Sequence, residues 1–312
     1  MQKSKLNRIN KFVKNPHRAV WQLAIPIMAG MSIQIIYGLV DMAFIGRIGG
    51  DALAAISFNM PLVFLFMGIT FGLGTGVTSV IAQFLGKNDK KSANNVAEHS
   101  ILIAIVLGII IPIFSVFFAD NIFLLLGAPP HILPLAVTYF KIIAIGFVFN
   151  ILNIFFKSIM TGEGDTKTPM FFRTIGTVIN LILDPVLIFG LKLGIAGAAL
   201  ATITGQFAVT LIFIYYILIK KKTYIKFNFS YFKFSTNIIT KILKVGVPAS
   251  ISMILMSFSV MIYNRLLITF GSNAVAGYGI SRNIIQIYFL PILALSNSMI
   301  TLTGMFYGRK EI

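Results

Sequence analysis

The chain alternates between eight long apolar stretches and short polar segments. The stretches cover about residues 20–45, 53–85, 93–118, 136–160, 168–189, 195–219, 242–270 and 274–307. As α-helices they are long enough to cross roughly 30 Å of hydrocarbon, for which about 20 residues suffice. The alternating pattern of a transmembrane β-barrel is absent from them. The pattern therefore predicts an all-α polytopic membrane protein.

The composition agrees with a membrane protein. Hydrophobic residues make up 57% of the 312 positions and charged residues only 11%, with a mean hydropathy of +0.90. A soluble domain could not bury this much apolar surface. The chain has no cysteine, which excludes disulfides and thiolate metal sites. No Ser-His-Asp, nucleotide or metal-ligand motif is present, so we expect neither an enzyme nor a cofactor.

The net charge of +17 is distributed unevenly. Most Lys and Arg residues lie in segments 1–18, 87–91, 157–173, 220–244 and 309–310. With a cytoplasmic N-terminus, all of these segments face the cytoplasm, which is the positive-inside bias of a multi-pass protein of the cell (inner or plasma) membrane. We therefore expect contact with anionic membrane lipid and no nucleic-acid partner.

A displacement of 222 residues aligns the first two apolar stretches with the last two without a gap. Pro26 then aligns with Pro248, and segment 49–54 with segment 271–276. Repeats of this kind are common in secondary transporters. The alignment predicts a complete six-helix N-lobe plus the first two helices of a second, repeat-related lobe.

The predicted domains follow from this repeat. They are a basic cytoplasmic N-terminus (1–18), the N-lobe (19–219), a cytoplasmic linker (220–241) and a partial C-lobe (242–312). A second lobe of six helices requires four more. Either the sequence is truncated, or a separate chain supplies the missing segment as a partner.

Two of the nine acidic residues, Asp41 and Asp184, lie deep within apolar stretches. A carboxylate in a bilayer is costly unless it is protonated, paired or hydrated, so intramembrane acids indicate proton or cation sites. The residue that the repeat aligns with Asp41 is Tyr263. We therefore expect a coupling site for H⁺ or Na⁺ in the N-lobe alone.

The stretch with Asp184 carries further polar groups on one face. Thr177, Asn180 and Asp184 are spaced i, i+3 and i+7, as residues on one side of a helix are. Their oxygens suit a cation, or a hydrogen-bonded proton. Pro185 removes a backbone donor and should open the helix near Leu181. The alternative is that Asn180 only satisfies Asp184 in a static core.

Asp41 has a similar setting. Gln34, Tyr37 and Asp41 share one helical face, and Pro26 about four turns earlier should bend that helix. A proline hinge joined to a titratable group predicts a moving part. The alternative places Asp41 at the outer interface, paired with Arg47.

Two other features have simple structural explanations. Thr202 would ordinarily bond back to its own helix, unless this helix lies beside the one with Asp184. Gly72, Gly74 and Gly76 fit close helix packing better than phosphate binding, since no Lys-Ser/Thr pair follows them.

Taken together, the motifs resemble those of the multidrug and toxic compound extrusion (MATE) transporters, particularly the prokaryotic DinF-like branch. The resemblance covers the chain from about residue 16. It rests on Ile25-Pro26, Val40-Asp41, Asp51-Ala52-Leu53-Ala54-Ala55, Gly162-Glu163-Gly164-Asp165-Thr166-Lys167, Asn180-Leu181-Ile182-Leu183-Asp184-Pro185, Gly194-Ile195-Ala196-Gly197-Ala198-Ala199 and Val245-Gly246-Val247-Pro248.

The resemblance implies a twelve-helix antiporter that works by alternating access and exports organic cations, drugs or amphipathic metabolites in exchange for H⁺ or Na⁺. It implies a cation site at Asp41, Asn180, Asp184 and Thr202, which is also where a Na⁺ ion would bind. Residues near this site or on the substrate path are Gln34, Tyr37, Asn153 and Thr177, and Pro26 is the hinge. Lys157 departs from the pattern, because relatives often carry a small polar residue there.

Two alternative functions remain. A lipid-linked oligosaccharide flippase of the same superfamily would have a cavity rich in Arg and Lys for pyrophosphate, whereas the apolar stretches are poor in both. The other alternative is a non-transporting fragment, truncated or split, that contributes an N-lobe to an assembly. Sequencing the DNA beyond codon 312 would separate this alternative from a partial record.

Overall fold

The computed structural model describes residues 11–12, 14–227, 232–267 and 272–309. Most of the predicted basic N-terminus, residues 1–10 and 13, lies outside this part. The described elements are α2 (Pro16–Gly46), α3 (Gly50–Gly86), α4 (Lys90–Leu125), α5 (Leu133–Gly162), α6 (Lys167–Pro185), the π-helix η1 (Val186–Gly190), α7 (Gly194–Ile214), the π-helix η2 (Tyr215–Ile219), α8 (Thr236–Leu267) and α9 (Ser272–Arg309).

The all-helical prediction is confirmed. Eight helices in the described part are long and apolar enough to cross a membrane. Several begin or end in polar residues beyond the predicted apolar stretches. The α4 helix begins at Lys90, because the Asp89 carboxylate caps it by accepting from the Ser92 backbone N–H (3.0 Å). Hydrogen bonds from Ser92 hold the pKa of Asp89 below its usual value.

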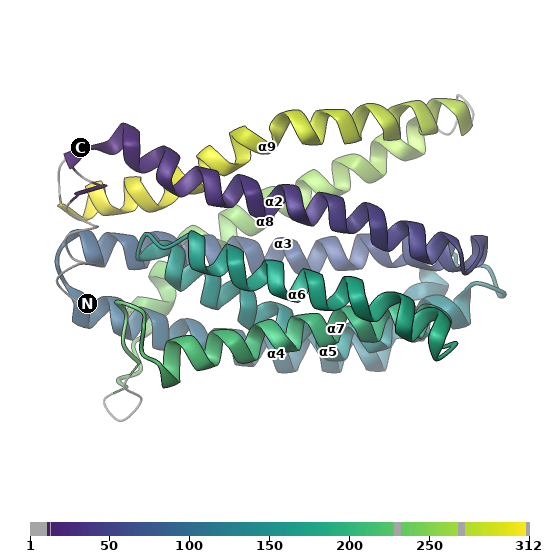
Figure 1. The fold of residues 1–312 in the computed structure, drawn as a ribbon, viewed down its shortest axis with the longest axis horizontal. Helices are drawn as coiled ribbons and strands as arrows, with labels where there is room; N and C mark the ends of the chain where they lie inside the picture. The colour runs from purple at the N-terminus through teal and green to yellow at the C-terminus, as the bar shows by residue number, and fades with distance from the viewer. Residues whose placement is uncertain (1–10, 13, 228–231, 268–271, 310–312) are drawn as a thin grey trace.

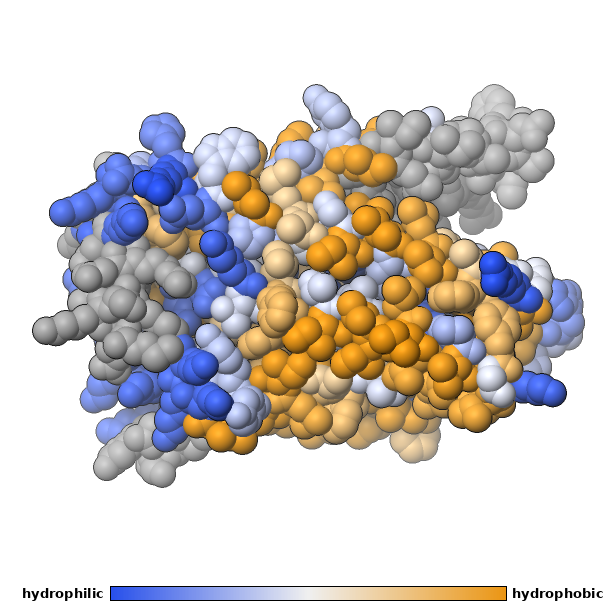
Figure 2. Space-filling model, in the orientation of Figure 1, coloured by the Kyte–Doolittle hydropathy of each residue, from blue (hydrophilic) through white to orange (hydrophobic). Residues whose placement is uncertain are grey.

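The helices lie side by side along the long axis of the molecule, and the start of α2, the end of α9 and the described linker residues lie at one end (Figure 1). The α5 helix packs against α3, α4 and α7, and α6 packs against α2 and α7. Figure 2 shows an apolar band across the middle and hydrophilic residues gathered mainly at the end with the linker. Exposed apolar side chains such as Phe117, at 77% exposure, fit contact with lipid.

The last two helices follow the internal repeat. Shifting α2 and α3 by 222 residues reproduces the bounds of α8 and α9 to within two residues. Pro26 and Pro248 both lie inside helices. The α8 and α9 helices pack directly against α3 and α2. The division into two lobes therefore remains a prediction.

Glycines make the contact between α3 and α8 a close one. A Cβ added at Gly72 would collide with the backbone of Ser250, and one at Gly76 with the carbonyl of Ile242 and with Gly246. Small residues at such contacts let two helix backbones approach each other. The glycine patch is thus a packing surface, as expected.

The linker is held against the bundle. The Glu163 carboxylate accepts hydrogen bonds from the backbone N–H groups of Tyr224 (2.8 Å) and Ile225 (3.0 Å). Burial, and then the charge of Glu163, raises the pKa of the Tyr224 phenol. His99, to which no sequence signal assigns a role, lies 2.8 Å by its Nε2 from the Ser235 backbone N–H. The α8 helix begins at Thr236, earlier than the predicted 242, and the connection is correspondingly shorter.

We expect Glu163→Ala to release the linker. The substitution leaves two backbone N–H groups without their acceptor, at a cost of about 1–3 kcal/mol. Trypsin cleavage at the linker lysines should become at least about fivefold faster, because proteolysis follows the population of the open form. Asn94→Ala is the control, since it removes one exposed bond to the Lys226 N–H (3.0 Å). Equal rates in both variants would refute the anchoring role.

Candidate functional site

The α2 and α6 helices face each other with polar side chains in matching order. Because both series run in the same direction, the two helices are parallel. The pairs are Gln34 with Arg173, Tyr37 with Asn180, and Asp41 with Asp184. The two polar faces that the sequence predicts separately therefore form one seam inside the bundle.

The two intramembrane acids lie together. Asp184 is fully buried, at 0% exposure, and its carboxyl group is within hydrogen-bonding reach of the Asp41 carboxyl. One buried oxygen of each has no protein donor in the described part of the chain. Ionised carboxylates only accept, so a hydrogen bond between them requires a proton on one. The alternative pairing of Asp41 with Arg47 is not observed among the described residues.

Asn180 links the acids to Tyr37 and to α7. With its amide oriented to satisfy its neighbours, Nδ2 donates to Asp184 Oδ2 (3.0 Å) and to Tyr37 Oη (2.9 Å). Its Oδ1 then accepts from the backbone nitrogen of Thr202 (2.9 Å). Thr202 Oγ1 donates to its own helix at the Ala198 carbonyl (3.0 Å), as expected, and also lies 3.4 Å from the Asn180 amide.

The site thus gathers Tyr37, Asp41, Asn180, Asp184 and Thr202. No described hydrogen bond joins three other predicted residues to it. Gln34 accepts from Arg173 Nη2 (3.3 Å) nearer the linker end of the bundle. Asn153 joins α5 to α7 by donating to the Gln206 carbonyl (2.9 Å) and accepting from Thr210 (3.0 Å). Thr177 lies on the same helix as Asp184, part-buried, without a described hydrogen bond.

Both prolines are placed as the sequence indicates. Pro26 is buried inside α2. Pro185 ends α6, and the chain continues directly as the π-helix η1. Pro185 has no N–H to donate to the Leu181 carbonyl, and the helix changes to a π-helix directly after the proline. Such π-turns often occur at functional sites.

Tyr139 on α5 is a neighbour of the site that sequence reasoning missed. It is part-buried and close enough to Asp41 and Asp184 for its hydroxyl to interact electrostatically with both. Its own helix offers no polar spacing that would connect it with α2 or α6. Only the packing of these helices reveals it.

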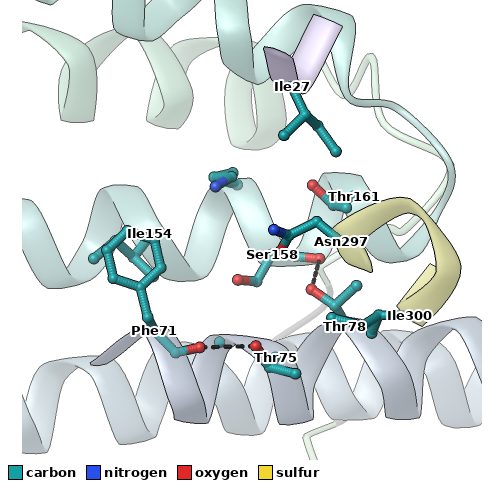
Figure 3. A pocket seen from close by; sticks show the side chains of 11 residues that line it. Ile27, Phe71, Thr75, Thr78, Ile154, Ser158, Thr161, Asn297 and Ile300 are labelled. Atoms are coloured by element: carbon teal, nitrogen blue, oxygen red, sulfur yellow. Dashed lines mark hydrogen bonds between the residues drawn. The ribbon is translucent and has the colours of Figure 1, made fainter. Parts of the chain in front are cut away.

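A second polar region lies nearer the linker end, in a small cleft between α2, α3, α5 and α9 (Figure 3). Lys157 lines it, together with Ile27, Phe71, Gly74, Thr75, Thr78, Ile154, Ser158, Thr161, Asn297 and Ile300. The cavity is about 30 Å³, enough for about two water molecules.

Comparisons with known proteins agree with this architecture. A family model described as MatE matches residues 26–186 and 248–312. The chain is 31% identical over 310 residues to the probable multidrug resistance protein YoeA of Bacillus subtilis (strain 168), covering 96% of this chain and 67% of that protein. It is 32% identical to the multidrug export protein MepA of Staphylococcus aureus (strain NCTC 8325 / PS 47), covering 93% and 65%.

The fold matches solved structures as well. One is the outward-facing conformation of a multidrug resistance MATE family transporter of the MOP superfamily, with a TM-score of 0.92 and 33% identity. The match covers 95% of this chain and 66% of that one. The chain spans about two thirds of the length of the relatives it matches.

Proposed function

The chain belongs to the MATE family of transporters, which are not enzymes, and on this basis we propose that it takes part in cation-coupled export of organic compounds. It is a multi-pass membrane protein, with eight candidate spans in its described part. Relatives named for multidrug resistance and multidrug export support drugs, organic cations or amphipathic metabolites as its substrates. The basic end of the bundle, and with it the N-terminus, faces the cytoplasm.

The observation that carries the proposal is the pairing of buried Asp184 with part-buried Asp41. Two acids that share a hydrogen bond hold one proton between them. When that proton leaves, two like charges remain in a space shielded from water, and the helices must rearrange or hydrate. A cation then drives transport because it binds one conformation more tightly than the other.

A proton fits the site better than Na⁺ in this conformation. Asn180 presents its amide nitrogen to Asp184 and Tyr37, and its carbonyl oxygen accepts from Thr202. A sodium ion between the acids would need the side-chain oxygen of Asn180 as a ligand. The amide would then have to be turned the other way. Na⁺ at Asp41, Asn180, Asp184 and Thr202 is therefore the second candidate.

Pro26 is the proposed hinge. It lies about four turns before Asp41 on α2, where it removes a backbone donor and permits bending. Protonation at Asp41 changes how the end of this helix packs against α6. The bend at Pro26 then passes the change to the linker end of the bundle.

The test is efflux from proteoliposomes containing the protein expressed from its complete reading frame. An inward H⁺ gradient should drive export of a fluorescent organic cation, and a Na⁺ gradient at equal pH should not. Export driven by Na⁺ alone would favour the second candidate. Efflux unaffected by either gradient would refute coupling.

A further inference from the structure

We propose that the cleft around Lys157 binds the anionic group of an amphipathic compound. This inference rests on the proposed function, and it adds anionic or zwitterionic molecules to the substrate class proposed there. Lys157 belongs to neither the acid pair nor its hydrogen-bonded neighbours. A lysine near the end of a membrane helix can extend its ammonium group to the interface, but Lys157 lines an internal cleft.

Lys157 carries a charge that its surroundings do not balance. In the described part of the chain, no carboxylate pairs with its ammonium group. Its ammonium group lies over the Phe71 ring, with Nζ 5.5 Å from the ring centroid. A part-buried ammonium without a counter-ion is costly, so the site favours an anion.

Arg173 strengthens the positive field. It approaches Lys157 closely enough to repel it, and its described hydrogen bond is to a neutral acceptor, Gln34 Oε1 (3.3 Å). An anion beside Lys157 would relieve this repulsion. The guanidinium group also matches the planar geometry of carboxylates and phosphates.

The carboxylates nearby are committed elsewhere. Glu163 accepts two backbone N–H groups of the linker. Asp184 lies eleven residues beyond Arg173 on the same helix, which is about 16 Å along its axis. Neither one is described as pairing with Lys157, so an anionic group bound in the cleft would supply the balancing charge.

The walls of the cleft suit an amphipathic anion. Figure 3 shows Ser158, Thr161 and Asn297 pointing into the same space. The hydroxyls of Ser158 and Thr161 donate to no described residue and remain available to an oxyanion. Phe71 and Ile154 add apolar surface. Because Asn297 belongs to α9, a ligand here would touch both halves of the repeat.

The probes are two xanthene dyes that share a ring system, anionic fluorescein and cationic rhodamine 6G. Binding to the purified protein, from its complete reading frame, is measured by fluorescence anisotropy without any ion gradient. We expect Lys157→Gln to weaken fluorescein binding about tenfold or more, the size of a charge-assisted contact. Lys157→Arg should retain most of the affinity, and rhodamine 6G should not bind more weakly to Lys157→Gln.

Lys141→Gln is the matched control, because Lys141 pairs with exposed Asp120 (2.7 Å) at the other end of the bundle. It should leave fluorescein affinity unchanged. Displacement by phosphatidylglycerol but not phosphatidylcholine would assign the site to a lipid, and no displacement would assign it to a soluble anion. Both results support an anion site.

Fluorescein affinity that is the same in wild type and Lys157→Gln would overturn the proposal. A failure of this binding test can be distinguished from a failure of the coupling mechanism, because binding is measured without a gradient. If Lys157→Arg lost fluorescein affinity to the same extent as Lys157→Gln, Lys157 would act through packing and not through its charge. That result would also overturn the proposal.

Discussion

Asp184→Asn should abolish gradient-driven efflux, with a fall of more than about tenfold to the background rate of empty vesicles, since Asp41 then has no second carboxylate with which to share the coupling proton. Asparagine has the shape of aspartate, and its oxygen still accepts from Asn180. It neither takes up nor releases a proton. The fold should survive, so substrate exchange without a gradient should persist.

Asp120→Asn is the control for this variant. It makes the same chemical change at a carboxylate that is exposed and paired with Lys141. Its gradient-driven efflux should stay within about twofold of wild type, because exposed pairs contribute little. If Asp184→Asn retained wild-type efflux under the same H⁺ gradient, the acid pair would have no role in coupling.

Gly76→Val should prevent the bundle from packing. A side chain at Gly76 collides with the Ile242 carbonyl and with Gly246, both on the backbone of α8, which cannot move aside as a flexible side chain can. Overpacking of this kind costs about 1–3 kcal/mol or more. We expect a lower melting temperature and a smaller monodisperse fraction in size-exclusion chromatography.

Gly38→Val separates packing from helix propensity. Gly38 is also inside a long helix, but a Cβ there meets nothing within 4 Å. Both variants change the intrinsic helix propensity equally. Gly38→Val should therefore melt near wild type, and equal melting temperatures for the two variants would contradict a close α3–α8 contact.

The helices could be predicted from the sequence because each apolar stretch has to satisfy its own backbone in lipid. Their ends were less certain. Polar residues such as Asp89 and Thr236 extend helices into the interface, where hydropathy no longer distinguishes helix from loop. The internal repeat also indicates where the helices end, because α8 and α9 follow the bounds of α2 and α3.

The sequence predicts the two polar faces of the candidate site, but not the contact between them. Helical spacing places Tyr37 and Asp41 on one face, and Asn180 and Asp184 on another, but no local rule joins the two faces. The contact between α2 and α6 joins them and adds Tyr139 from a third helix. Lys157 is similar, because its cleft is closed by Asn297 from α9, far away in the sequence.

The sequence by itself determined that this protein is a membrane-embedded helical protein with the motifs of the MATE family, and that two acids lie within its spans. These properties depend on the cost of placing polar groups in lipid, which acts on each segment separately. Only the tertiary structure decided that the acids share one site, that Asn180 lies beside Asp184 and Tyr37, and that Lys157 lines a cleft in which no carboxylate of the described residues pairs with it. These depend on distances between helices, which the packing of the whole bundle sets.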